Sequence, residues 1–192
     1  MKKHDIKMLS RSLGIMLAVL VIAGGVTYAA LQSQPIKLTG NTIETATANL
    51  QVSTDGTNFA TSLAGFDFAN LVPGGAAVPT GGYTFTLKNG GAVNLNLKLA
   101  VSSTPSNPSN VDLSKVNVIL TPSLGTPQTF NLQALMNAET TGGVAITAPS
   151  QLFAGTRQLF TIQVSMAIDA LSGSSANLGN IDFAFTGVAV TS

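Results

Sequence analysis

The feature of this chain that most constrains its fold is an alternation of apolar and polar side chains that repeats every two residues. In residues 160–168 every even position is apolar, and the odd positions between them are mainly polar. A period of two places the apolar side chains on one face of a β-strand, where they can pack against a core. Comparable runs occupy residues 83–88, 94–101 and 181–185, and weaker strand candidates are Thr45–Ser53, Asn58–Ser62, Phe66–Leu71, Val116–Thr121 and Gly143–Thr147.

The segments between these runs are rich in turn-forming residues. Asn89–Val93, with glycine at positions 90 and 91, joins two alternating runs and predicts a β-hairpin. Pro73-Gly74-Gly75 predicts a tight turn, because proline fixes φ and glycine can take the left-handed conformation. The alternative, a phosphate-binding loop, lacks the glycine-rich motif that such loops carry. Thr104–Asn110 predicts a polar loop, and the apolar spacing in Phe130–Asn137 predicts one or two helical turns. Together these signals predict an all-β, antiparallel sandwich with a short helix, in a single domain over residues 44–192.

Residues 1–29 have the three-part pattern of a secretory signal peptide. Four basic residues lie within the first eleven positions, and a nearly continuous apolar stretch follows over Leu13–Ala23. Thr27 and Ala29 then occupy the −3 and −1 positions of a cleavage site, so that Ala30 becomes the first residue of the mature chain. The alternative is an uncleaved membrane anchor, because the 18 residues of Leu13–Ala30 just reach spanning length.

The composition of the expected mature chain excludes several classes of function. Its five Lys and Arg residues stand against seven Asp and Glu, so it has no basic excess with which to bind nucleic acid. The single histidine, His4, is lost with the signal, and the chain has no cysteine. Without imidazole or thiol, and with its carboxylates scattered singly, the chain is predicted to be no enzyme and to hold no catalytic residue, metal or cofactor.

The surface expected for this chain is unusually neutral. Only 9% of the residues are charged, while 45% are hydrophobic. Disordered chains show the opposite balance, and ordinary soluble monomers carry more charge. A neutral surface rich in hydroxyl and amide groups favours a protein that packs against copies of itself.

Residues 30–43 are the segment with the clearest functional interest. Leu31, Ile36, Leu38 and Ile43 supply its apolar positions, and Pro35 is typical of the start or edge of a strand. Two interpretations stay open: the first strand of the chain's own sheet, or a donor strand that completes the sheet of a neighbour. Burying three such side chains contributes roughly 5–9 kcal/mol at most, and association costs about 4–15 kcal/mol. A donor strand therefore also needs a full ladder of backbone hydrogen bonds.

Several patches of the sequence, each of them short, resemble the TasA/camelysin family of secreted matrix-fibre proteins. The matching patches are GGVTYAA at 24–30, GNTI at 40–43, TATANLQVS at 45–53, FANLVPG at 68–74, YTFTLKNGGAVNLNLKL at 83–99 and GNIDFAF at 179–185. The resemblance implies a jelly-roll-like sandwich whose subunits join through N-terminal donor strands into biofilm fibres or bundling pili. Residues 30–43 would then be the donor strand.

The chain also departs from the pattern of that family. Leu31 and Gln32 stand where the family often has an aromatic residue and an acid, and Gly75 stands where an acid commonly follows Pro-Gly. Camelysins have been described as metalloproteases, but this chain lacks an H-E-x-x-H motif and a mature histidine. The protease activity is therefore not carried over.

These expectations lead to one leading functional hypothesis. The chain is expected to be an extracellular structural subunit, in the biofilm matrix or at the cell surface, that assembles into fibres by donor-strand exchange. Its expected partners are signal peptidase during export and then copies of itself, with no nucleic acid and no stable membrane insertion after cleavage. The first alternative is a monomeric cell-surface adhesin held by an uncleaved N-terminal anchor. The second is an enzyme of the camelysin type, which the absence of histidine from the mature chain disfavours.

Overall fold

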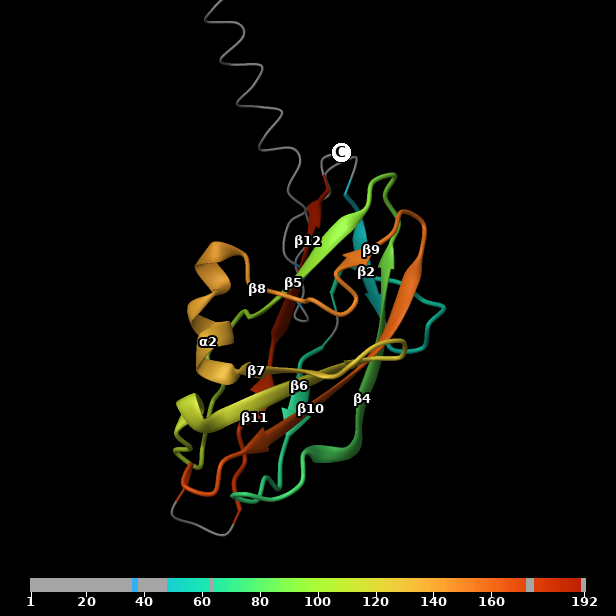
Figure 1. Ribbon diagram of the computed structural model, residues 1–192. Helices are drawn as coiled ribbons and strands as arrows, with labels where there is room; N and C mark the ends of the chain where they lie inside the picture. Colours follow the sequence, from blue (N-terminus) through green and yellow to red (C-terminus); the bar gives the residue numbers. More distant parts are fainter. Residues whose placement is uncertain (1–35, 38–47, 63, 172–174, 191–192) are drawn as a thin grey trace, which may run out of the picture.

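The computed structural model describes residues 36–37, 48–62, 64–171 and 175–190, and it consists mainly of antiparallel β-strands (Figure 1). Among the described residues, one short α-helix and two 3-10 helices lie between the strands. In chain order the elements are β1 (Ile36–Lys37), β2 (Leu50–Ser53), β3 (Phe66–Phe68), β4 (Val78–Asn89), β5 (Leu95–Val101), η1 (Leu113–Lys115), β6 (Val116–Pro122), β7 (Gln128–Asn131), α2 (Leu132–Asn137), η2 (Glu139–Thr141), β8 (Val144–Ala145), β9 (Gln151–Leu152), β10 (Arg157–Met166), β11 (Gly179–Ile181) and β12 (Phe183–Ala189).

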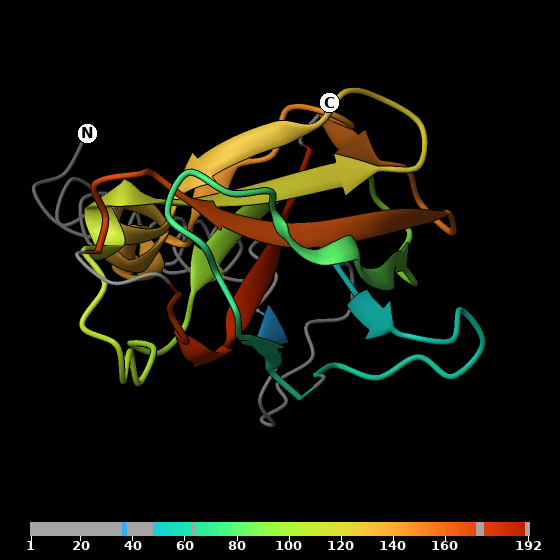
Figure 2. The same ribbon diagram turned by 90° about the horizontal axis from the view of Figure 1, so that it is seen from below.

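The strands form two five-stranded sheets and one two-stranded sheet. One large sheet has the order β1-β12-β5-β8, with β9 also pairing with β5, and the other has the order β2-β4-β10-β6-β7. The small sheet pairs β11 with β3. In the view from below, the sheet that contains β10 spans the molecule above β3 and β12 (Figure 2). The predicted all-β antiparallel sandwich is thus confirmed, while the more specific jelly-roll description stays a prediction.

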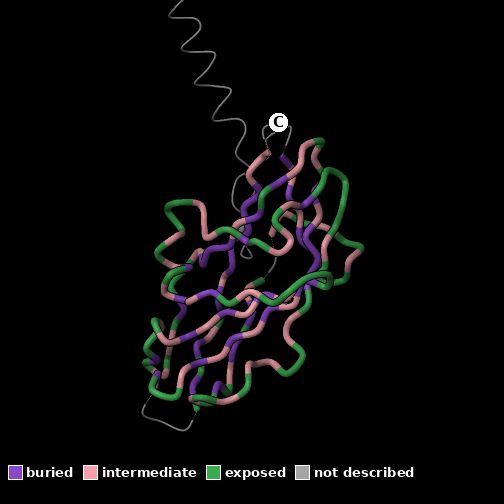
Figure 3. The backbone as a smooth tube through the Cα atoms, in the orientation of Figure 1, coloured by how far each residue is buried: buried purple, intermediate pink, exposed green. Residues whose placement is uncertain are grey.

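Aromatic side chains from both large sheets fill the space between them. The Phe85 ring on β4 lies 5.1 Å from the Phe185 ring on β12, and it stacks on Phe160 of β10 at 5.7 Å. Phe183 meets Phe68 of the small sheet edge to face at 6.2 Å. These five rings are essentially inaccessible to solvent. Buried positions alternate with less buried ones along the strands (Figure 3), as the period-two pattern predicts.

Most of the predicted strands exist, although their bounds differ. β10 spans Arg157–Met166, and its alternating burial follows the predicted pattern. Ile168 lies beyond the end of this strand and is 78% exposed, which corrects the assumption that it faces the core. The predicted strand Asn58–Ser62 is also wrong, because that segment contributes only an isolated bridge between Ala60 and Val52. Its hydrogen bonds otherwise go to the side chain of Asp55, which favours a loop over a strand.

The predicted hairpin between residues 83–88 and 94–101 is wrong in its pairing. β4 pairs with β10 and β2, whereas β5 pairs with β12, β8 and β9. Residues 90–94 therefore carry the chain from one large sheet to the other. Asn89 fixes this crossover: its buried amide nitrogen donates to Val93 O at 2.8 Å and Leu152 O at 3.0 Å. Its amide oxygen accepts from Gly91 N at 3.0 Å, so both ends of the amide have partners.

The predicted helix and turns are confirmed with small changes. α2 begins at Leu132, after Asn131, whose side chain accepts a hydrogen bond from Ala134 N at 3.1 Å as an N-cap. Residues 130–131 belong to β7 instead. At the Pro73-Gly74-Gly75 turn, Gly74 has φ 68° and Gly75 N donates to Val72 O at 2.9 Å. Residues 104–110 form no strand or helix, as predicted.

Several predictions concern residues that lie outside the described part of the chain. They are the signal peptide over residues 1–29, with its cleavage residues Thr27, Ala29 and Ala30, and the donor positions Leu31, Leu38 and Ile43. Of the predicted donor segment, the structure describes the backbone of Ile36 and Lys37, which form β1. For residues 30–43, the structure therefore adds one observation, which is the register of β1 against β12.

Candidate assembly surface

The β1 strand lies at the edge of the sheet that contains β12. Ile36 is paired with Phe185 and Lys37 with Ala184, in antiparallel register. On its other side β12 pairs along its whole length with β5. In this structure β1 is thus an edge strand of its own chain, which is the arrangement expected from the first of the two interpretations of this segment. A donor strand from a neighbour would occupy the same edge.

The register of β1 relates this edge to the core. Phe183 and Phe185, two residues apart on β12, are fully buried between the sheets. Directly opposite positions in an antiparallel pair share a face of the sheet, so register assigns position 36 to the core face. Position 37, opposite Ala184, belongs to the other face. The alternation predicted from the sequence is therefore compatible with the backbone pairing.

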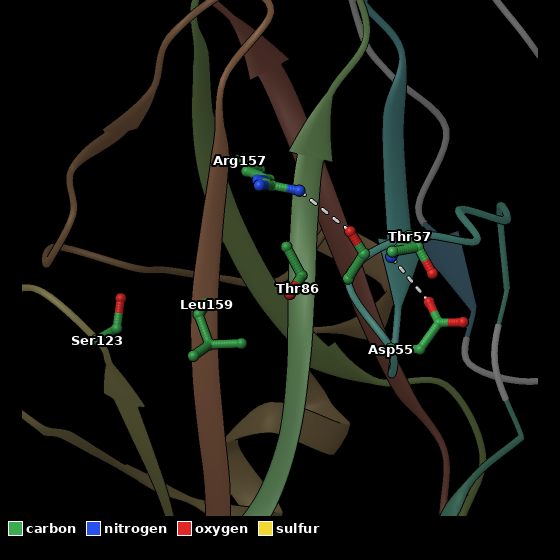
Figure 4. A pocket seen from close by; sticks show the side chains of 7 residues that line it. Asp55, Thr57, Thr86, Ser123, Arg157 and Leu159 are labelled. Carbon is green, nitrogen blue, oxygen red and sulfur yellow. Dashed lines mark hydrogen bonds between the residues drawn. The ribbon is translucent and has the colours of Figure 1, made fainter.

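A cleft of about 470 Å³ lies on the outer face of the other large sheet (Figure 4). Arg157 and Leu159 of β10 and Thr86 of β4 lie side by side along it, because Leu159 is directly paired with Thr86. The loop after β2 and Ser123, which follows β6, complete its walls. None of these residues belonged to a sequence-predicted site. Strand pairing brings them together from distant parts of the chain, so no local sequence motif could reveal the cleft.

Two polar groups in this cleft retain unused hydrogen-bonding capacity. The exposed guanidinium of Arg157 donates one bond, from Nη1 to Gly56 O at 3.1 Å, and otherwise has no partner among the described residues. Thr86 is only 6% exposed, yet its hydroxyl bonds to no described residue. Buried hydroxyl groups are normally hydrogen-bonded. The cleft thus combines a guanidinium group that has further donors to offer with a buried hydroxyl that lacks a partner among the described residues.

The Asp55 carboxylate lines the same cleft, but its own loop occupies it. It accepts hydrogen bonds from Asn58 N and Thr57 N, both at 2.8 Å, and from Ser53 Oγ at 2.7 Å. The side-chain amide of Asn58 adds a further bond at 2.6 Å. The backbone bonds from Asn58 and Thr57 are the main cause that holds the pKa of this carboxyl well below its ordinary value. Asp55 therefore orders the loop and is not poised to bind a ligand.

A second, smaller cleft of about 290 Å³ lies near the beginning of β4. Asp67 of β3, Tyr83 and Pro79 are among the residues that line it. The Tyr83 hydroxyl donates a hydrogen bond to the backbone oxygen of Asp67 at 2.7 Å, which ties β3 to β4. The carboxylate of Asp67 takes no part in this bond. The Asp67 side chain is exposed, and its carboxylate accepts no hydrogen bond from a described residue.

Three other acidic side chains of the described residues have hydrogen-bond partners within the chain. Lys115 pairs with Asp169 at 2.6 Å, and this hydrogen bond lowers the pKa of Asp169 and raises that of Lys115. Asp182 accepts from Ser103 Oγ at 2.8 Å, and Asp112 accepts from Ser114. Asp67 therefore differs from these three in having a carboxylate without a partner among the described residues.

The described residues include no group of three acidic, histidine or cysteine side chains placed to hold a metal ion. They likewise include no helix with the length and apolar character needed to cross a membrane. The candidate surfaces among the described residues are the β1 edge and the two clefts. Comparison with known proteins gives no family to which these surfaces can be referred, since no family model, curated protein or solved structure matches the chain.

Proposed function

We propose that this chain is a secreted structural subunit that assembles into extracellular fibres by donor-strand exchange, with residues 30–43 as the donor. The observation that carries the proposal is the pairing of β1 with β12. The backbone of Ile36 and Lys37 lies on a sheet edge formed by β12, whose side chains Phe183 and Phe185 belong to the central core. A strand supplied by a neighbour can make the same backbone bonds and take the same register.

The described β1 strand is short, with two residues against the seven of β12. Each net backbone hydrogen bond contributes only about 1 kcal/mol, so the bonds of Ile36 and Lys37 contribute little by themselves. An edge strand that leaves its own sheet exposes a row of unpaired backbone groups, which is a template for another chain. Exchange replaces the pairing within one chain with the equivalent pairing between two subunits.

The position of the donor at the start of the domain favours an open polymer. A segment that leaves one subunit and enters the next makes a heterologous contact, in which different surfaces of the two copies meet. Such contacts continue indefinitely unless their rotation closes a ring. The low content of charged residues, 9% of the chain, reduces repulsion between stacked copies. The resemblance of the sequence to matrix-fibre proteins points to the same function.

The pairing of β1 within its own sheet also fits the second candidate, a monomeric cell-surface adhesin held by an uncleaved N-terminal anchor. In that case β1 is a permanent edge strand and the domain is complete without a neighbour. The two candidates differ in what the loss of the segment does. A donor is needed for assembly, whereas a permanent strand is needed for stability.

The test is deletion of Leu31–Thr39 from the mature chain, with fibres examined by negative-stain electron microscopy. Donation predicts that fibres disappear while the remaining domain still melts cooperatively as a β-rich monomer. Ile36→Asp is expected to lower fibre yield at least about tenfold, because a charge on the core face is costly to desolvate. Lys37→Ala is the matched control, and it should leave the yield close to that of the parent chain, because position 37 belongs to the opposite face.

Thermal unfolding of each variant separates the two candidates. If the deletion prevents folding, β1 is a permanent strand and the adhesin is favoured. Normal fibres from the deletion variant would remove residues 31–39 from the assembly mechanism altogether.

A further inference from the structure

We infer that the Arg157 cleft is a docking site for the Asp67 carboxylate of a second copy of this chain, so that consecutive subunits are joined by an Arg157–Asp67 contact as well as by the donor strand. This inference rests on the proposed self-assembly and identifies a contact within it. Its chemistry is the pairing of a guanidinium fork with a carboxylate, which can form two parallel hydrogen bonds.

The two groups cannot meet within one subunit. Arg157 is paired with Lys88 near the end of β4, whereas Asp67 is anchored by the hydroxyl of Tyr83. Tyr83 and Lys88 are five residues apart, a separation of about 17 Å along the strand. A pairing of these two groups therefore joins two copies of the chain. Because the groups differ, their pairing is a heterologous contact and extends a filament.

The cleft is suited to a carboxylate in particular. Arg157 supplies the charged donors, and the hydroxyl of Thr86 lies within the cleft with no described partner (Figure 4). Leu159, which is 43% exposed, gives the cleft an apolar wall against which a neighbouring surface can pack. Asp55 does not compete for Arg157, because four hydrogen bonds from its own loop hold its carboxylate.

The charges around the two clefts are complementary. Beside the Asp67 cleft, the small sheet carries Asp67 on β3 and, directly after β11, Asp182, and neither of its two strands contains a basic residue. Near the Arg157 cleft, Arg157 and Lys88 stand against Asp55. Opposite net charges at the two surfaces favour the encounter of the acidic surface of one copy with the basic surface of the next.

Apolar side chains accompany the charges on both surfaces. Ile168 and Val72, which lie beside the Gly74-Gly75 turn, are exposed near the end of β10, where Gly74 N donates to Met166 O. Leu159 lies at the opposite end of that strand. Exposed apolar side chains near both partners allow the contact to bury apolar area around the ion pair, which limits its screening by salt.

The test uses charge reversal in the purified mature chain, with assembly followed by light scattering and sedimentation. Arg157→Glu and Asp67→Arg are each expected to slow assembly by about tenfold or more at low salt, because the pair becomes two like charges. The double reversal should restore assembly to within about threefold of the parent chain. Asp112→Arg is the matched control: it makes the same change of charge, but Asp112 bonds to Ser114 in its own chain, so its effect on assembly should be much smaller than that of Asp67→Arg.

Mixing the two single variants gives the sharpest result. In an equimolar mixture, the glutamate introduced at position 157 of one copy can face the arginine introduced at position 67 of the other, and the unchanged Arg157 can face the unchanged Asp67. The mixture should therefore assemble as an alternating copolymer although each variant alone assembles poorly. Thr86→Val removes the unpartnered hydroxyl without changing the shape of the side chain, and it should slow assembly while leaving monomer stability equal or higher.

Three outcomes would overturn the inference: assembly unaffected by the single reversals, no recovery in the mixture or the double variant, or binding of free carboxylate compounds to the cleft with no effect of Asp67→Arg. The last outcome would mean a different occupant. Failure of the proposed function is recognised separately, by fibres that survive deletion of residues 31–39 while the reversal and rescue pattern holds. A parent chain that stays monomeric at every concentration would overturn both.

Discussion

Two connections in this molecule have the same length and both contain glycine, but they join strands in different ways. Residues 123–127 follow β6 and contain a glycine, and after them β7 returns beside β6, with Leu120 opposite Gln128. Residues 90–94 follow β4 and also contain glycine, but after them β5 enters the other large sheet. The first connection makes a hairpin, and the second makes a crossover between the two layers of the sandwich.

The difference depends on contacts far along the chain. β4 has both of its sides occupied, by β10 and β2, so β5 has no free edge to join. The buried amide of Asn89 then binds Leu152 O, which belongs to β9 on the far side of the crossover. Turn residues specify that the chain reverses, but the occupancy of the neighbouring sheet positions decides where it goes.

The largest expected effect comes from breaking the crossover at Asn89. Asn89→Ala should lower the free energy of unfolding by about 2–3 kcal/mol, because it leaves the carbonyl oxygens of Val93 and Leu152 without their donor in the interior. Chemical denaturation followed by circular dichroism measures this change. Asn94→Ala is the matched control in the same connection. It removes one exposed hydrogen bond, to Ala154 N, and should cost much less. Equal losses in the two variants would contradict the role given to Asn89.

The sequence predicted the elements of this fold better than their pairing. Alternation located β4, β5, β6 and β10, because side chains on one face of each strand enter the core whichever partner lies beside it. The pairing of β4 with β10 is not local, and neither periodicity nor turn chemistry specifies it. The same limit explains the loop at residues 58–62, where the Asp55 carboxylate takes the backbone groups that a strand would use.

The candidate surfaces show the same contrast between features that a local sequence pattern predicts and features that depend on strand pairing. Residues 30–43 were identified from their own apolar spacing, and the register of β1 is compatible with it. The Arg157 cleft could not be predicted, because Thr86 and Arg157 come together through the pairing of β4 with β10. Asp67 is one of several scattered acids in the sequence. Its distinction is the absence of a partner among the described residues, which the sequence cannot show.

A smaller effect on stability is expected in residues 123–127, the hairpin loop between β6 and β7, where the contacts are local. Gly125 has φ 135°, and a Cβ at this position would lie 3.1 Å from Pro122 Cγ. Gly125→Ala should therefore destabilise the protein by about 1 kcal/mol. Leu124→Ser, at a neighbouring position that is 79% exposed, should stay within about 0.5 kcal/mol of the parent chain. Denaturation midpoints measure both, and a larger loss at Leu124 would show that this loop, like the crossover, is held by distant contacts.

The smallest expected effect is the pH dependence of the stability that the Asp55 loop contributes. The two connections above should show no such dependence. The Asp55 loop is held by a carboxylate, whereas the crossover is held by the neutral amide of Asn89. Hydrogen bonds from Asn58 and Thr57 lower the pKa of Asp55 in the folded state below its ordinary value of 3.8. A lowered pKa adds stability at pH values above the unfolded pKa, and this stability is lost as the pH falls through the folded pKa.

Comparison of the parent chain with Asp55→Asn isolates that contribution. Asparagine can still accept the two backbone bonds through its amide oxygen, but it carries no charge, so its variant should be the less stable at pH 7. As the pH falls below about 4 the carboxyl group becomes protonated in the unfolded parent chain while the folded carboxylate stays ionised, so the gap in stability between the two chains should narrow until the folded pKa is reached. Denaturation curves from pH 7 to the acid limit of folding measure the gap. A gap that stays constant over this range would mean that Asp55 acts through its shape alone. A gap that narrows for Asp55→Asn but not for Asn89→Ala would establish that charge orders one loop and a neutral amide the other.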